Sequence, residues 1–278
     1  MARESDRQVF VDAMKNTFCA LGLNETVSFA FMHPAMFDRL QVPKDSDLRQ
    51  AIAIMNPLTD EYPLVRTTLL PNLLENAMRN FSRKNEDIRL FEVAPVFFPK
   101  GLPVTEEPRE ILKTVGLIAG HRQPMGWSQG KENVDFYDAK GIIEQLLSAL
   151  SIKNYTVEGG HHFALHPGKT AAFKKGRETI AVVGEVHPAV AAAFGASKTM
   201  YVFEMDVPTL MKYANGKFSY QPLPKYPAIL RDLAVLVEES VAAADIERVM
   251  KKNGGSHLKN VSLFDNYQIG RASCRERV

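Results

Sequence analysis

The fold of this chain is decided by the stretch RTTLLPNLLENAMRNFSRKNEDIRLFEVAPVFF, residues 66–98. Its first half places apolar residues at helical spacing, namely Leu70, Leu73, Leu74, Ala77, Met78 and Phe81. Pro71 falls near the start of this pattern, where a missing amide hydrogen costs little. The second half, residues 88–98, is typical of a long strand, and Pro95 within it predicts a bulge or an irregular edge. A helix followed by a long strand is therefore the centre of the predicted fold.

Further elements are predicted on both sides of this stretch. Before it, residues 6–21 predict an amphipathic helix, and residues 26–31 predict a strand that has Val27, Phe29 and Phe31 on one face. The other predicted elements are strands at 51–55, at 114–121, near Tyr155, and at 170–174, 180–186 and 199–206, and helices at 34–41, 136–150 and 188–195. Because hairpins and irregular loops join most of these strands, we expect an α+β domain with a largely antiparallel sheet and flanking helices.

The C-terminal part of the chain has a different composition. Residues 211–228 contain Pro222, Pro224 and Pro227 and predict a linker. After it, a strand at 230–237, a helix at 242–253 and a strand at 258–267 predict the βαβ start of a second small domain, residues 229–268. The basic tail 269–278 looks foreign to the rest of the chain.

Composition narrows the class of protein. The chain has 278 residues, 45% of them hydrophobic, and a formal charge of +2, which is ordinary for a soluble globular protein. This charge neither indicates nor excludes nucleic-acid binding. Cys19 and Cys274 are the two cysteines, and they give no disulfide framework, so we expect a reducing cytoplasm. No run of apolar residues is long enough to cross a bilayer, and no signal peptide opens the chain.

The stretch HHFALHPGKTAAF, residues 161–173, looks chemical because it holds three histidines and a Gly-Lys-Thr. A P-loop would need a glycine at position 163, which is Phe163. His162 and His166 have a spacing that suits metal binding on a helix, but Pro167 disfavours a helix there. On a strand the two histidines would stand roughly 13 Å apart, too far to share one ion. We therefore predict a loop that leads into a strand, and no metal site.

Seven motifs in order resemble one family. They are NPLTDEYPLVRTTLLPNLLENAMRN, IRLFEVAPVF, VDFYDAKGIIEQLL, HPGKTAAF, VGEVHPAVAAAFG, YPAILRDLAVLV and VSLFDNYQ. Together they resemble the β subunit of bacterial phenylalanyl-tRNA synthetase, over residues 7–268. The resemblance is to a C-terminal portion of that subunit, because its N-terminal editing and magnesium-binding modules do not precede residue 1.

The resemblance implies two domains and two partners. Residues 1–210 would be a catalytic-like but non-catalytic core with the class II synthetase fold, and residues 229–268 the first half of a ferredoxin-like anticodon-binding domain. The partners would be the catalytic α subunit, in an α2β2 assembly, and phenylalanine tRNA. The implied location is the cytoplasm, with no membrane contact. This chain would hold no cofactor, since ATP and magnesium would be bound elsewhere in the whole enzyme.

Adenylate formation by a class II enzyme needs two arginines that stabilise charge. One lies at the end of a strand of the second motif, but residues 96–98 are Val-Phe-Phe. The other lies in a GxGxGxER-like motif, which is absent from residues 170–215; KTMYVFEMDVPTL, residues 198–210, has Glu204 and no arginine. We therefore expect a subunit of a ligase that does not catalyse by itself. The alternative is a standalone class II synthetase-like pseudoenzyme that acts as a binding module.

Contact residues follow from the resemblance and from residue type. Arg66, Leu70 and Leu74 are the candidates for the interface with the α subunit. Arg66 has a second interpretation, an ion pair with one of three acids: Asp60, Glu61 or Glu92. The helices at 6–21 and 66–83 are also expected to leave an apolar association surface exposed.

Candidates for tRNA contact lie at the start of the second domain. They are Lys225, Tyr226, Arg231 and Phe264, through phosphate neutralisation and aromatic stacking. Arg231 has an alternative role, a structural ion pair with Asp232.

Other conspicuous residues have structural explanations. Asp135 is expected to cap the helix that follows it, and Asp138 to be an acid favoured in the first helical turn. Trp127 is expected to be a packing anchor in a loop. His166 and His187 each precede a proline, and local hydrogen bonding is their expected role.

Overall fold

The computed structural model describes residues 5–57, 59–101, 103–123, 126–127, 130–215, 220, 223, 225–238 and 240–266. The chain divides into two compact units, Met1–Ser219 (unit 1) and Tyr220–Val278 (unit 2). The division falls inside the proline-containing segment 211–228. No helix in the described ranges combines the length and apolar character needed to cross a membrane.

Unit 1 is built on a seven-stranded sheet with the order β1-β4-β5-β9-β8-β7-β6. The strands are β1 (Asn24–Glu25), β4 (Ile88–Phe98), β5 (Arg109–Ala119), β6 (Thr156–Gly159), β7 (Leu165–Lys175), β8 (Glu178–Val186) and β9 (Met200–Asp206). Neighbouring strands are antiparallel, except that β1 runs parallel to β4. The α+β prediction is confirmed, and the sheet is mixed because of this edge. A small separate sheet pairs β2 (Phe31–Met32) with β3 (Leu64–Val65).

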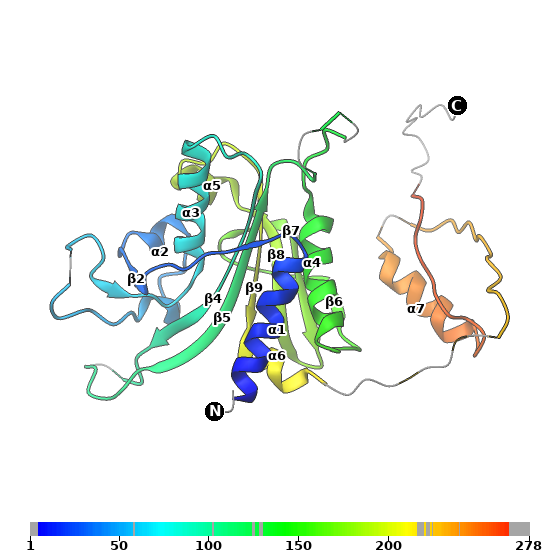
Figure 1. The fold of residues 1–278 in the computed structure, drawn as a ribbon, viewed down its shortest axis with the longest axis horizontal. Coiled ribbons are helices and arrows are strands. Elements are labelled where there is room, and N and C mark those ends of the chain that lie inside the picture. Colours follow the sequence, from blue (N-terminus) through cyan, green and yellow to red (C-terminus); the bar gives the residue numbers. More distant parts are fainter. Residues whose placement is uncertain are drawn as a thin grey trace. The chain divides into compact units, whose positions relative to one another are not determined.

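Helices cover both faces of the large sheet (Figure 1). On one face lie α1 (Asp6–Ala20), α4 (Phe136–Ala149) and α6 (Val207–Tyr213). On the other lie α2 (Met36–Arg39), α3 (Leu70–Ser82) and α5 (Pro188–Ala193). A short 3-10 helix, η1, spans Asp47–Arg49. The sheet therefore separates two hydrophobic cores.

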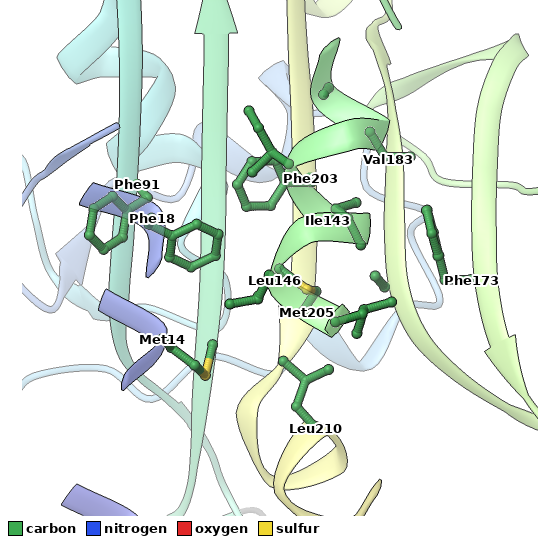
Figure 2. Packing of buried hydrophobic residues seen from close by; sticks show 14 of the residues in the cluster. Met14, Phe18, Phe91, Ile143, Leu146, Phe173, Val183, Phe203, Met205 and Leu210 are labelled. Carbon is green, nitrogen blue, oxygen red and sulfur yellow. The ribbon is translucent and has the colours of Figure 1, made fainter. Parts of the chain in front are cut away.

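The first core packs α1, α4 and α6 against the sheet, as Figure 2 shows. The Phe18 ring lies 4.9 Å from the Phe91 ring and 5.6 Å from the Phe203 ring, centroid to centroid. Gly116 on β5 faces the same cluster, and a Cβ atom there would come within 2.0 Å of the Phe203 ring. Glycine is therefore required at position 116 by close packing.

The second core is formed by α3 and the opposite face of β4 and β5. Leu70, Leu73, Leu74 and Ala77 are all buried, so the helical pattern of the opening stretch is confirmed. Pro95 causes no bulge, because it pairs in continuous register with Leu112 on β5. On its other edge, β4 pairs with β1 only as far as Phe91. No strand therefore lies beside Pro95 on that edge, and the missing amide hydrogen of Pro95 breaks no strand pairing.

Two of the strands predicted before residue 66 are wrong. Residues 26–31 do not form one strand, since β1 ends at Glu25 and β2 begins at Phe31. The reason is that side chains replace the backbone ladder after Thr26: the Ser28 amide donates to Glu92 Oε1, not to a neighbouring strand. Residues 51–55 form only an isolated bridge, between Ala53 and Leu64.

The histidines and the helix cap behave as predicted. His166 Nδ1 accepts a hydrogen bond from the Gly168 amide at 3.1 Å, and His187 Nδ1 accepts one from the Ala189 amide at 3.2 Å. Asp135 caps α4 in a reciprocal capping box with Asp138. The strand predicted to follow the histidine-rich stretch is longer than expected, because β7 already begins at Leu165.

Unit 2 contains helix α7 (Ala243–Asn253), close to the predicted helix at 242–253. The strands predicted at 230–237 and 258–267 are not formed in the described part of these ranges. A strand exists only when a neighbour completes its hydrogen-bond ladder, and none of the segments of unit 2 that the structure describes pairs with them. The tail 269–278 lies outside the described residues.

Candidate functional site

The three side chains predicted for the subunit interface lie inside unit 1. Leu70 and Leu74 are fully buried on the face of α3 that packs against β4 and β5. Arg66 is also buried, just before α3 begins. The leucines have the helical spacing that covers a sheet, so in this conformation they cannot meet another chain directly.

Arg66 forms a buried ion pair with Glu92, whose side chain is 2% exposed. Arg66 Nη1 lies 2.9 Å from Glu92 Oε1, and its Nε donates to the Pro95 carbonyl oxygen at 3.1 Å. Of the two interpretations of Arg66, the ion pair is therefore the one that the structure forms. Removing either partner would leave an unpaired buried charge, which is strongly unfavourable.

The same ion pair holds an exposed apolar edge, which we define as Val27 and Phe29. These side chains are 91% and 82% exposed, although residues 26–30 run along the edge of the sheet. The Ser28 amide donates to Glu92 Oε1, and further contacts fasten the segment: Arg66 Nη1 and Asn72 Nδ2 donate to the Phe29 carbonyl, Asn76 Nδ2 to Ser28 Oγ, and the Arg66 amide to the Ala30 carbonyl. The buried polar network therefore fixes a surface that shows two large apolar side chains to solvent.

A cation that the sequence alone did not indicate lies opposite the end of β4. Arg109 on β5 lies directly opposite Phe98, and its guanidinium carbon lies 5.7 Å from the centre of the Phe98 ring. Asp47 lines the same small pocket, of about 140 Å³, so the local charge is mixed. Strands β4 and β5, each of eleven residues, form a hairpin, and its register brings Arg109 opposite Phe98. The sequence did not predict this register.

Residues 198–210, where the third synthetase motif would need an arginine, contain acids that form ion pairs with a lysine of the neighbouring strand. Lys113 Nζ on β5 lies 2.8 Å from Glu204 Oε1 and 3.2 Å from Asp206 Oδ1 on β9. Burial alone would lower the pKa of Lys113, but attraction to Glu204 and Asp206 raises it overall. Burial would raise the pKa of Glu204, and Lys113 lowers it overall. Lys113 is therefore already paired and is not a free cation.

His162 lies close to this network and is half-buried. Its Nδ1 accepts a hydrogen bond from the Ala164 amide at 3.2 Å. Burial lowers the pKa of His162; Glu204 opposes this effect, while Lys113 and His161 add to it. Within the described ranges, no group of three or more histidine, cysteine or acidic side chains is arranged to hold a metal ion.

The predicted tRNA-contact residues Lys225, Tyr226, Arg231 and Phe264 are all exposed on unit 2. No hydrogen bond, ion pair or ring contact joins the four in the part of unit 2 that is described, and Arg231 does not pair with Asp232 there. Nearby is an apolar groove of about 360 Å³, lined by Leu233, Val235, Val237, Val241, Asp245, Ile246, Val249 and Met250. This unit therefore offers cations and aromatic rings on an open surface.

The prediction for Trp127 is wrong. Its side chain is 101% exposed, so it does not anchor the packing of its own loop. A tryptophan surrounded by glycine and polar residues gives no local pattern by which exposure could have been predicted.

Comparison with known proteins assigns both units. Residues 1–207 match the family described as the phenylalanyl tRNA synthetase beta chain CLM domain. Residues 224–275 match the ferredoxin-fold anticodon binding domain, and this match includes residues 269–275 of the tail that looked foreign.

Curated relatives with the name phenylalanine–tRNA ligase beta subunit align with almost the whole chain. The protein of Syntrophotalea carbinolica is 36% identical over 260 residues, which are 93% of this chain and 32% of the relative. That of Geobacter sulfurreducens is 37% identical over 251 residues, 89% of this chain and 31% of the relative. The chain thus spans about a third of the length of these relatives.

Solved structures agree on the fold. Pyrrolysyl-tRNA synthetase from Desulfitobacterium hafniense superposes with a TM-score of 0.57 at 12% sequence identity, covering 74% of this chain and 68% of that one. At this identity the likeness concerns the fold alone. The family match over residues 1–207 carries the assignment: this chain belongs to the phenylalanyl-tRNA synthetase β-chain family.

Proposed function

We propose that this chain is a portion of the β subunit of a bacterial phenylalanyl-tRNA synthetase, and that it supports the ATP-dependent charging of phenylalanine tRNA. The observation that carries the proposal is the pair of family matches, which together span residues 1–207 and 224–275. The relatives' name, phenylalanine–tRNA ligase beta subunit, supports the same role. The protein would act in the cytoplasm.

In this proposal unit 1 does not form the adenylate. Two observations support this: residues 96–98 carry no arginine, and Lys113, the cation beside Glu204 on β9, is already paired with Glu204 and Asp206. A free, preorganised cation is what stabilises charge during adenylate formation. ATP and magnesium would be bound by the α subunit, and this chain would hold no cofactor.

The partner of unit 1 would be the α subunit, in an α2β2 assembly. The exposed apolar edge, Val27 and Phe29, is a surface suited to such a contact, because large apolar side chains left in solvent favour association. Arg66, Leu70 and Leu74 would act from inside, by holding this edge and the helix behind it in place.

The partner of unit 2 would be phenylalanine tRNA. Lys225 and Arg231 would neutralise phosphates, and Tyr226 and Phe264 would stack on bases or riboses. All four side chains are accessible in unit 2 as described, which supports this assignment.

Co-expression with the α subunit of a bacterial phenylalanyl-tRNA synthetase, followed by size-exclusion chromatography, tests the proposal. We expect a stable complex that co-elutes, and ATP–pyrophosphate exchange in the complex but not in this chain alone. Exchange by the isolated chain, lost on a point substitution in unit 1, would overturn the non-catalytic role. A chain that stays monomeric and indifferent to the α subunit would instead support a standalone binding module.

A further inference from the structure

The turn between β7 and β8 lies at the end of the sheet where α6 follows β9 (Figure 1). Lys175 and Glu178 are paired across this two-residue turn. The end of α6 is fastened to it, because Lys212 Nζ lies 2.6 Å from Glu178 Oε1 and the Tyr213 hydroxyl donates to Glu178 Oε2 at 2.6 Å. We call this surface the basic rim and define it by its five cations, Lys153, Lys174, Lys175, Arg177 and Lys212.

The ring of Tyr213 holds two of these cations in place. Lys212 Nζ lies 5.1 Å from the centre of the ring, and Lys175 Nζ lies 5.6 Å from it. Attraction to an aromatic ring positions an ammonium group without neutralising its charge. Lys175 also donates to the Lys153 carbonyl oxygen, which ties the segment between α4 and β6 to the turn. The basic rim is therefore one continuous surface built from three segments of unit 1.

The basic rim has more cations than carboxylates. Lys174 is paired with Glu158. Lys212 is paired with Glu178. The other three cations have no carboxylate partner among the residues that the structure describes. The adjoining ends of α1, α4 and β5 carry equal numbers of both charges, and the Lys113 network described above adds one carboxylate in excess, so the surplus of cations remains. The equal pairs are Asp6 and Arg7, Lys140 and Glu144, and Arg109 and Glu110.

The composition of the basic rim favours a nucleic-acid backbone over an anionic membrane. Its two tyrosines, Tyr155 and Tyr213, are half-buried, and no large apolar side chain is exposed in the described segments that form it. Stable attachment to a bilayer needs an apolar or lipid insertion in addition to a basic cluster. A phosphate backbone needs only cations that are free to neutralise it, because each neutralised phosphate releases counterions.

The basic rim is also close in sequence to the RNA-binding candidates of unit 2. Twelve residues lead from Tyr213 to Lys225. An extended chain of that length spans at most about 43 Å. Whatever the arrangement of the two units, one RNA molecule can therefore reach the cations of both.

We infer that the basic rim is a second RNA-contact surface, on unit 1, which binds the phosphate backbone without reading its sequence. The inference rests on the proposed function, because the RNA is the phenylalanine tRNA proposed as the partner of unit 2. In this role Lys153, Lys175 and Arg177 neutralise phosphates, and Tyr213 is a positioning residue that holds Lys175 and Lys212.

Binding of labelled phenylalanine tRNA to the full chain at several salt concentrations, measured by fluorescence anisotropy, tests the inference. The rim variant is Lys153→Ala with Arg177→Ala, which removes two exposed cations. It should reduce the slope of log K against log salt by roughly 1.4–1.8, since two phosphate contacts are lost. Lys153→Arg with Arg177→Lys keeps the charges and should keep the slope. An RNA hairpin without the phenylalanine anticodon should show the same difference, because phosphate contacts carry no sequence information.

The matched control is Lys44→Ala with Arg83→Ala. It removes the same charge from the other face of the sheet, where neither side chain forms an ion pair with a described residue, and it should leave the slope close to that of the unchanged chain. Equal slopes for the rim and control variants would overturn the inference and leave the contacts of unit 2 intact.

Two further outcomes would also overturn it. The rim variant could keep the tRNA slope but lose binding to vesicles of equimolar phosphatidylcholine and phosphatidylserine, which would assign the rim to a membrane surface. If the unchanged chain did not bind tRNA at all, the inference and the proposed RNA partner would both be refuted, while pairing with the α subunit would be decided separately by co-elution.

Discussion

The sequence left two roles open for Arg66, a contact with the α subunit and an internal ion pair, and the structure forms the ion pair. Its guanidinium is tied to Glu92, to the Pro95 carbonyl and to the Phe29 carbonyl, so its contacts are all within unit 1. We predict that Arg66→Met lowers the free energy of unfolding by about 3–5 kcal/mol, because Glu92 keeps a buried charge without its partner. Urea denaturation followed by circular dichroism measures this.

The double variant Arg66→Met, Glu92→Met is the control for that prediction. It removes both charges and replaces them with apolar side chains of similar length, so much of the lost stability should return. If Arg66→Met left the stability of the isolated chain unchanged and only weakened binding to the α subunit, the internal role assigned to Arg66 would be wrong.

The lowered pKa of His162 leads to a prediction of how the stability of unit 1 depends on pH. Burial lowers the pKa of His162 below its ordinary value of 6.5, so folding favours the neutral ring. This contribution to stability is present above the unfolded pKa and is lost as the pH falls below about 6.5. Glu204, whose pKa is also lowered, adds a loss only below its ordinary value of 4.5. Between pH 7 and 5 the free energy of unfolding should therefore fall, with a slope of at most about 1.4 kcal/mol per pH unit from this one ring.

The variant His162→Asn isolates this effect from the other histidines. An asparagine oxygen can accept the Ala164 amide as His162 Nδ1 does, but it does not titrate. Denaturant unfolding at pH 7 and pH 5 should show a smaller difference for this variant than for the unchanged chain. Equal differences would mean that His162 is not the group responsible.

At the scale of elements, local pattern predicted some segments well and failed at others for physical reasons. Helix α3 and strand β4 were predictable, because one continuous apolar pattern buries each of them. Residues 26–31 have a strand's alternation too, but polar side chains hold the segment and leave Val27 and Phe29 in solvent. Alternation shows that a chain is extended, but it does not show whether a neighbour completes the ladder.

The candidate site was less predictable than the fold. Arg109 and Lys113 meet their partners only through the register of the sheet, and Lys113 is 91 residues away from Glu204. No local spacing contains that information. The exposure of Trp127 was missed because no local spacing distinguishes a loop tryptophan that packs from one that stays in solvent.

Two glycines in the sheet and its covering helix give opposite predictions for the same substitution. Gly116→Ala should lower the free energy of unfolding by about 1–3 kcal/mol, because the new Cβ meets the buried Phe203 ring. Gly141→Ala should raise it by about 0.5–1 kcal/mol, since Gly141 is inside α4 and a Cβ there meets no atom within 4 Å. Thermal denaturation of the two variants compares them directly, and a similar effect of both would contradict the close packing inferred at Gly116.

At the scale of the whole molecule, the two units differ in what their surfaces can do. Unit 1 buries two cores on either side of its sheet, and the two cations buried or half-buried against that sheet, Arg66 and Lys113, are held in ion pairs. In the described part of unit 2 no residue is buried, and Lys225 and Arg231 form no ion pair. The tRNA-binding prediction is therefore directed at these two exposed cations of unit 2.

This difference leads to a prediction for binding of phenylalanine tRNA by the full chain. Binding should weaken steeply with salt, because each phosphate neutralised by a cation releases counterions. Lys225→Ala and Arg231→Ala should each reduce the slope of log K against log salt by roughly 0.7–0.9. Tyr226→Ala should weaken binding by about 1–3 kcal/mol without changing that slope, since stacking releases no ions.

Arg248→Ala is the matched control for these measurements, because Arg248 is already paired with Asp245 on α7. A cation held by its own carboxylate neutralises phosphate poorly, so this variant should leave the slope close to that of the unchanged chain. Fluorescence anisotropy with labelled tRNA at several salt concentrations gives the slopes of the unchanged chain and of the four variants. If Lys225→Ala and Arg231→Ala had the same slope as Arg248→Ala, the RNA contact would have to lie elsewhere. The search would then move to other cations of unit 2, such as Lys259.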